Sequence, residues 1–202
     1  MIYLKTYERY RKEKYDNKKL IIIDIQPTYR IHMNMDMTDF THWLNEHDYF
    51  NILYLYNGPD FGYEDEYEIR DWLRDYDLED SSNMSFFEKN YAFFRDFMDN
   101  DVDDDEIVKV GKYLIEKDIR DIREIDEEDR KYLLENVDID EKFLNGDWSF
   151  YIPEAKDELM SFLNKGDKPL CIGGGEYQCF KEIILLLRML DFEWDEESQF
   201  IY

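Results

Sequence analysis

Leu20-Ile-Ile-Ile-Asp-Ile25 is the stretch of sequence that decides the fold. It is short, β-branched and almost wholly apolar, which is typical of a strand buried on both faces of a parallel sheet. Other short runs rich in β-branched and aromatic residues predict further strands. They are Ile52-Leu-Tyr-Leu-Tyr56, Met84-Ser-Phe-Phe87, Pro169-Leu-Cys-Ile172 and Phe200-Ile-Tyr202.

Segments with apolar residues at helical spacing alternate with these strands. The predicted helices cover residues 38–47, 66–76, 91–98, 106–116, 127–135, 153–163 and 177–190, with Pro153 at the first helical position of the sixth. Strands that alternate with helices indicate an α/β fold with a mainly parallel, doubly wound, Rossmann-like sheet. We therefore expect residues 1–202 to form a single α/β domain, with a helical insertion at about residues 99–150.

The composition narrows the class of protein. The chain has 202 residues, enough for one domain, and its 17% aromatic content argues against disorder. The 50 acidic residues exceed the 25 basic ones by 25, which opposes direct binding to nucleic acid and to anionic membranes. No run is long enough to cross a membrane, and the start of the chain does not resemble a secretory leader. We expect a cytoplasmic protein whose two cysteines are reduced.

Polar residues and glycines follow three of the predicted strands. Asp24 and Gln26 lie at the end of the first strand, Asn57 begins a turn after the second, and Gly173, Gly174 and Gly175 join another strand to a helix. If the strands are parallel, all of them lie on one edge of the sheet, where doubly wound proteins bind ligands. Gln26, Asn57 and the three glycines are therefore candidate ligand-binding residues for a small molecule. A tight turn with close helix packing explains the glycines equally well.

Three residues have side chains suited to nucleophilic chemistry. Cys179 lies near the start of a predicted helix, where a thiol is expected to have a lowered pKa; a lone cysteine is also a common core residue. Asp24 interrupts an apolar strand, so its charge needs a partner or an open strand end. Lys89 follows the predicted strand Met84-Ser-Phe-Phe87, and its position alone predicts a lysine on the surface.

Together these residues resemble a known enzyme family. Ile22-Ile-Asp24-Ile-Gln26, Glu88-Lys89-Asn-Tyr-Ala-Phe93 and the segment from Ile172-Gly173 to Cys179 are similar to the aspartate, lysine and cysteine elements of the isochorismatase-like cysteine hydrolases, which include nicotinamidases. The resemblance implies Cys179 as nucleophile, Asp24 as general base and Lys89 as the charge that supports the thiolate. It implies hydrolysis of an amide or vinyl ether in a small molecule, or a degenerate relative that still binds a ligand.

A second resemblance covers more of the chain. Ile23-Asp-Ile-Gln-Pro27, Tyr54-Leu-Tyr-Asn-Gly-Pro59, Lys89-Asn-Tyr-Ala-Phe-Phe-Arg95 and the stretch from Gly173-Gly-Gly to Cys179-Phe-Lys-Glu182 resemble an uncharacterised family of tailed-bacteriophage proteins. The abundance of Ile, Asp, Glu, Tyr, Phe, Lys and Asn beside only two alanines is typical of an AT-rich coding genome and agrees with a bacteriophage source. The resemblance implies no particular activity, and it places the protein in the cytoplasm of a host.

Two other classes of function stay open. A strongly acidic surface can imitate a nucleic acid backbone, so the chain could bind and inhibit a basic host protein without catalysis. Asp24, Asp60 and Glu64 could instead hold magnesium, as in PIN-like nucleases. The acidic run from Asp99 lacks the glycine and glutamate of an EF-hand loop, and the three histidines have no cysteine cluster beside them. We expect no resident metal or cofactor, and the sequence leaves the oligomeric state open.

Overall fold

The computed structural model describes residues 18–47, 50–78, 83–89, 94–100, 102–137, 139–144 and 149–202, without the side chains of Phe61, Arg95 and Lys142. Its centre is a five-stranded sheet in the order β3-β2-β1-β4-β5, and every neighbouring pair is parallel. The strands are β1 (Lys19–Ile23), β2 (Asn51–Asn57), β3 (Met84–Lys89), β4 (Leu170–Gly173) and β5 (Asp195–Glu196). The predicted α/β class with a parallel sheet is confirmed.

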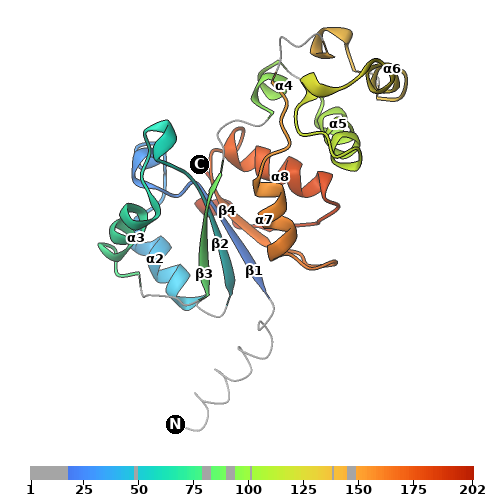
Figure 1. The fold of residues 1–202 in the computed structure, drawn as a ribbon. Helices are drawn as coiled ribbons and strands as arrows, with labels where there is room; N and C mark the ends of the chain where they lie inside the picture. The colour runs from blue at the N-terminus through green and yellow to red at the C-terminus, as the bar shows by residue number, and fades with distance from the viewer. Residues whose placement is uncertain are drawn as a thin grey trace.

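Helices cover both faces of the sheet (Figure 1). On one side lie α2 (Met37–Glu46) and α3 (Glu66–Arg74), and on the other lie α7 (Ala155–Phe162) and α8 (Cys179–Met189). The chain thus builds β1, β2 and β3 outward in one direction and then returns to place β4 on the other side of β1. This change of direction makes the boundary between β1 and β4 the topological switch point of the sheet.

Alternation of side chains explains why the central strands are apolar throughout. In β1, Ile21 and Ile23 join the core beneath α8, whereas Leu20 and Ile22 join the core beneath α2 and α3. Successive side chains of a strand point to opposite faces, so a strand covered on both faces has no solvent-facing position. The two cores meet only through the sheet, and the predicted burial of the first strand on both faces is confirmed.

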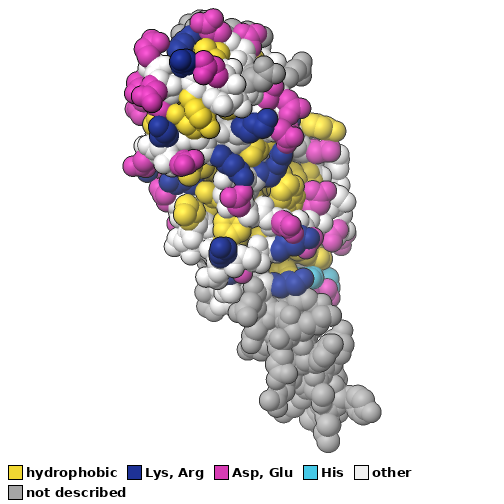
Figure 2. Space-filling view, turned by 90° about the vertical axis from the view of Figure 1, so that its right-hand side faces the viewer, with side chains coloured by type: hydrophobic (Ala, Val, Ile, Leu, Met, Phe, Trp, Pro, Cys, Tyr) yellow, Lys and Arg dark blue, Asp and Glu magenta, His cyan; other side chains and the backbone are white. Residues whose placement is uncertain are grey.

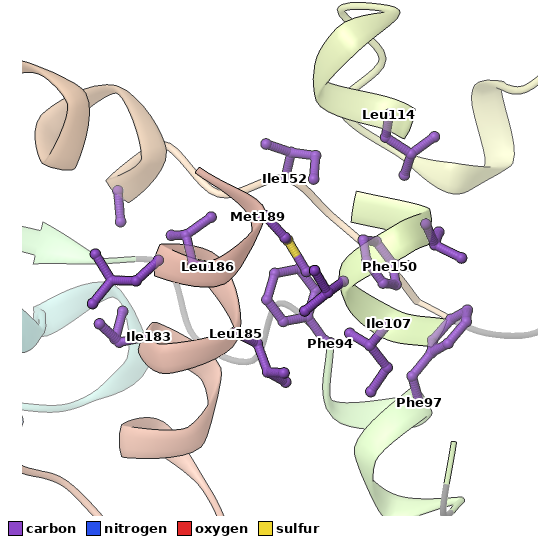
Figure 3. Close-up of a cluster of buried hydrophobic side chains, with 14 of the residues drawn as sticks. Phe94, Phe97, Ile107, Leu114, Phe150, Ile152, Ile183, Leu185, Leu186 and Met189 are labelled. Carbon is purple, nitrogen blue, oxygen red and sulfur yellow. The ribbon is translucent and has the colours of Figure 1, made fainter. Parts of the chain in front are cut away.

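A helical insertion follows β3. It contains α4 (Arg95–Asp99), α5 (Asp104–Glu116) and α6 (Glu127–Asn136), together with short 3₁₀ turns at Ile122–Glu124 and Glu141–Leu144. Phe94, Phe97 and Phe150 pack against one another, with ring centroids 4.7 and 4.9 Å apart, between the insertion and α8 (Figure 3). The same buried cluster includes β1 residues, so the insertion shares the core of the sheet.

Several element boundaries differ from the sequence-based predictions, including the start of the last helix at Cys179 rather than residue 177, and one predicted helix lies partly outside the described residues. The predicted last strand at residues 200–202 is wrong: Phe200 ends a 3₁₀ turn, and the edge strand is the exposed pair Asp195–Glu196, which no hydrophobic pattern marks. The sixth helix begins at Ala155, because the Pro153 carbonyl accepts a hydrogen bond from Lys156 N in a preceding turn. Of the predicted helix 91–98, residues 91–93 are outside the described chain, and α4 begins at Arg95.

The distribution of charge on the surface is relevant to the hypothesis that the protein imitates a nucleic acid backbone. Figure 2 shows acidic side chains interspersed with lysines, arginines and apolar groups over the face that it presents. That face therefore offers no continuous acidic strip of the kind that imitates a nucleic acid backbone. Within the described part of the chain, no helix combines the length and apolar character that a membrane span requires.

Candidate functional site

The carboxyl ends of β1, β2, β3 and β4 bring the candidate residues to one edge of the sheet. The ladder pairs Ile23 with both Leu55 and Gly173, and it pairs Asn57 with Lys89. Asp24 is the first residue beyond β1, and Asn57 and Lys89 end their strands. The predicted common rim is therefore present, and its centre is the switch point between β1 and β4.

Asp24 is a fully buried carboxylate at this edge. Its main chain turns out of the sheet in the left-handed region, with φ of 49°, after its N–H has donated to Leu55 O at 2.9 Å. Among the described residues, the Lys89 ammonium and the Cys179 thiol are its hydrogen-bonding neighbours, although neither carboxylate oxygen has a donor of good angular geometry. A buried carboxylate with this spare acceptor capacity is costly unless a cation lies beside it.

Lys89 supplies that cation. Its Nζ atom lies 2.9 Å from Asp24 Oδ2 and donates to Asn57 Oδ1 at 2.9 Å. Neighbouring strands are about 4.8 Å apart, so the Lys89 side chain from β3 and the Asp24 side chain at the end of β1 together bridge roughly 10 Å across the end of β2. The long lysine stem achieves this while only 1% of the side chain is exposed. Lys89 is thus not the surface lysine that its isolated position in the sequence suggests.

Cys179 completes the group as the first residue of α8. Its thiol is close enough to Asp24 and Lys89 for the charges of both to act on it, and the residue is 8% exposed. The three residues come from the end of β3, the start of α8 and the position directly after β1, and they are separated by 65 and 90 positions in the sequence. The structure therefore brings together the three side chains that the sequence analysis named as candidate catalytic residues.

The expected low pKa of Cys179 is wrong. Burial raises the pKa of the thiol well above its usual range, and the negative charge of Asp24 raises it further, while the positive charge of Lys89 opposes them. The position at a helix N-terminus does not overcome these effects. The pKa of Lys89 is raised instead: burial alone lowers it, but the charges of Asp24 and of its neighbours outweigh burial. At neutral pH the site therefore holds a neutral thiol beside the Lys89 ammonium group.

Gln26 and Asn57 form the scaffold of the site. The Gln26 side chain donates to Asn57 O at 3.1 Å and accepts from Asn57 N at 3.0 Å, as the next residue of a β-ladder would. The Asn57 side chain accepts from Lys89 and donates to Tyr29 Oη at 2.9 Å. Both residues are fully buried. Their amide groups make internal hydrogen bonds in the structure described, and that they also bind a ligand stays a prediction.

The three glycines permit close packing of β1, β4 and α8. Gly173 and Gly174 have φ of 83° and 71° and are buried. A Cβ atom at Gly174 would lie 2.8 Å from Phe180 N, and one at Gly173 would overlap the Ile23 carbonyl oxygen. Gly175 is less constrained and lies beside Gln178. Of the two interpretations of this segment, the tight turn accounts for Gly173 and Gly174 without a ligand.

Sequence reasoning missed three other members of the site. Glu182 is 2% exposed, one turn after Cys179, and its charge acts on both Lys89 and Cys179. Tyr202 donates its hydroxyl hydrogen to Asp24 O at 2.9 Å. The hydroxyl of Tyr29 lies where the charges of Asp24 and Cys179 act on it. The apolar character of α8 was a usable signal for Glu182, since a glutamate within such a helix needs a buried partner.

Other sites considered from the sequence find no support in the geometry. Within the described ranges, no group of three or more His, Cys, Asp or Glu side chains is placed to hold a metal ion. Asp60 is exposed, and Glu64 accepts hydrogen bonds from Gln26 at 3.0 Å and Thr28 at 2.7 Å. Asp24, Asp60 and Glu64 therefore do not form the magnesium site that a PIN-like nuclease requires.

Comparisons with known protein families, with curated proteins and with solved structures gave no match to this chain. The function therefore has to be argued from the geometry itself. Two surface cavities, of about 390 and 500 Å³, lie against α8 and are lined by neither Asp24, Lys89 nor Cys179. In the structure described, the three side chains form a closed group beneath the rim.

We expect Asp24→Asn to lower the pKa of Cys179. The change removes the negative charge that opposes thiolate formation and leaves the positive charge of Lys89, while burial keeps the pKa above that of free cysteine. The check is the rate of alkylation by iodoacetamide as pH rises, in a Cys171→Ser background. Asp60→Asn, which changes an exposed carboxylate of the same rim, is the control and should titrate as the parent does. Equal titration of all three proteins would contradict the prediction.

Proposed function

We propose that the chain is a hydrolase of small-molecule amides or related acyl compounds, with Cys179 as nucleophile. The observation that carries the proposal is the convergence of Asp24, Lys89 and Cys179 from three separate elements at the switch point of a parallel sheet. A group of three buried, chemically complementary side chains is much less common by chance than a single buried polar side chain. Their agreement with the elements shared with isochorismatase-like hydrolases adds to the argument.

The hydrogen bond between the Cys179 thiol and the Asp24 carboxylate suits Asp24 to act as general base. In the first step Asp24 takes the thiol proton as Cys179 Sγ attacks the carbonyl carbon of the substrate. The C–N bond then breaks, the protonated Asp24 gives its proton to the leaving amine, and an acyl thioester remains on Cys179. Asp24 next takes a proton from water as the water oxygen attacks the thioester, the C–S bond breaks to release the acid, and Asp24 returns the proton to Cys179 Sγ. The sum is amide plus water giving acid plus amine.

Lys89 and the start of α8 stabilise the negative charges that form during this cycle. Lys89 offsets the charge of the adjacent Asp24 carboxylate and attracts the thiolate once it forms. The negative oxygen of the tetrahedral intermediate needs donors, and the first turn of α8, whose N-cap residue Gln178 provides no side-chain cap, has main-chain N–H groups at the correct end of the helix. A thiol that stays protonated until substrate binds is also protected from oxidation.

The proposal is tested with p-nitrophenyl acetate as an activated acyl probe, followed by a panel of small primary amides assayed for ammonia. We expect acetylation of Cys179, located by peptide mass, and loss of turnover by a factor of about 100 or more in Cys179→Ser. Cys171→Ser, which alters the other buried thiol, should retain activity. Asp24→Asn should separate two properties: alkylation becomes faster, because the thiol pKa falls, while hydrolysis is lost, because the base is gone. Acetylation spread over lysines, with Cys179 unmodified, would overturn the proposal.

A further inference from the structure

Tyr202 joins the segment that carries Asp24 to the segment that carries Cys179. Its hydroxyl donates to Asp24 O at 2.9 Å. Its main-chain N–H donates to Gly174 O at 3.1 Å, and its carbonyl accepts from Glu176 N at 2.7 Å. One residue therefore contacts the turn after β1 and both sides of the loop that leads into α8.

The main chain of Asp24 depends on such support. Asp24 adopts the left-handed conformation, which residues with a Cβ atom occupy rarely and mostly with local hydrogen-bonding support. Its N–H donates to Leu55 O, and the Tyr202 hydroxyl satisfies its carbonyl. The direction in which the carboxylate leaves the main chain is set by these dihedral angles, so the hydroxyl of Tyr202 helps to define where the carboxylate lies.

The hydroxyl is also held in its donating form. Burial raises the pKa of Tyr202 well above its usual range, and the charges of Asp24 and Cys179 raise it further. The raised pKa keeps the tyrosine hydroxyl protonated, and so a donor, at neutral pH. The charges of Asp24 and Cys179 both act on the Tyr202 hydroxyl, so this hydroxyl lies near both residues.

We propose that Tyr202 is a positioning residue that holds the Asp24 carboxylate against the Cys179 thiol. Its catalytic meaning rests on the proposed function, but its effect on the thiol is measurable without any substrate. If Tyr202 acts in this way, loss of its hydroxyl loosens Asp24 and weakens the negative charge felt by the thiol. The pKa of Cys179 then falls.

The experiment is the alkylation titration with iodoacetamide in a Cys171→Ser background, applied to Tyr202→Phe. Phenylalanine keeps the ring and the main-chain hydrogen bonds and removes only the hydroxyl. Tyr113→Phe is the matched control, because it removes a hydroxyl that hydrogen-bonds Asp129 at 2.6 Å in the helical insertion. We expect Tyr202→Phe to be alkylated faster than the parent at a given alkaline pH, by about tenfold for each unit that the thiol pKa falls. Tyr113→Phe should titrate as the parent does.

A second background shows whether the effect passes through Asp24. In Asp24→Asn the carboxylate is already absent, so adding Tyr202→Phe should leave the thiol titration unchanged. Overlapping titrations of Tyr202→Phe and the parent would overturn the proposal, and so would an equal shift in the Asp24→Asn background. A failed hydrolysis assay affects neither outcome, because the alkylation reports the thiol alone. Conversely, a null result for Tyr202 leaves acylation of Cys179 to be judged by its own assay.

Discussion

Lys89→Met is expected to lower the free energy of unfolding by about 3–5 kcal/mol at neutral pH. Methionine replaces the stem of the lysine but removes the ammonium group 2.9 Å from Asp24 Oδ2. The carboxylate is then left buried without its cation, close to the second buried carboxylate, Glu182, whose charge also acts on Lys89. Asn57 Oδ1 loses its donor at the same time. The measurement is urea unfolding followed by tryptophan fluorescence.

Two variants separate charge pairing from general damage to the core. Asp24→Asn combined with Lys89→Met removes both charges, so it should lose less stability than Lys89→Met alone, although it carries one more substitution. Lys131→Met is the surface control, because its ammonium pairs with Glu135 at 3.8 Å where both side chains are exposed; its loss should stay below about 1 kcal/mol. If Lys89→Met unfolds at the same urea concentration as Lys131→Met, the buried pair does not stabilise the fold.

The sheet was predictable from local pattern, because the central strands β1, β2 and β4 are buried on both faces and are apolar between their ends. Leu20 to Ile23 illustrates this, since alternate side chains enter the two separate cores. The edge strand β5 had no such signal: both of its residues are exposed and acidic, and they form a strand only because they lie beside β4. The prediction failed there because pairing across the sheet, rather than hydrophobic pattern, determines an edge strand of two residues.

The site was predictable in part, for a different reason. Asp24 could be identified because a charge beside an apolar strand needs an explanation, and parallel topology then placed the strand ends together. The pKa of Cys179 could not be predicted, because it depends on how deeply the thiol is buried and on how near Asp24 lies. Tyr202 was assigned to a strand, since its aromatic ring and β-branched neighbour favour one. Its hydroxyl instead pairs with a residue 178 positions away, which no local pattern reports.

Gly173→Ala is expected to destabilise the protein by about 3–5 kcal/mol, because two costs combine. The residue has φ of 83°, a conformation that alanine adopts only with strain, and its Cβ would overlap the Ile23 carbonyl oxygen and lie 2.8 Å from Ile25 Cγ1. The obstructing oxygen belongs to the main chain of β1, so it cannot move without breaking the β1–β4 ladder. We expect weaker binding between these strands and, with it, displacement of Asp24 from Cys179. The urea midpoint should fall, and Cys179 should alkylate faster at a given pH.

Gly111→Ala provides the matched comparison for this last prediction. Gly111 lies within α5, and an added Cβ would meet the side chain of Met189, a flexible group that can move aside. Alanine also favours a helix over glycine by about 1 kcal/mol, so the net change should remain within about 1 kcal/mol of the parent. A loss as large as that of Gly173→Ala would mean that crowding at any buried glycine is equally harmful. We expect instead that Gly173→Ala loses more stability than Gly111→Ala. This difference would show that the cost at Gly173 comes from overlap with the rigid main chain of β1, where β1 ends at the site.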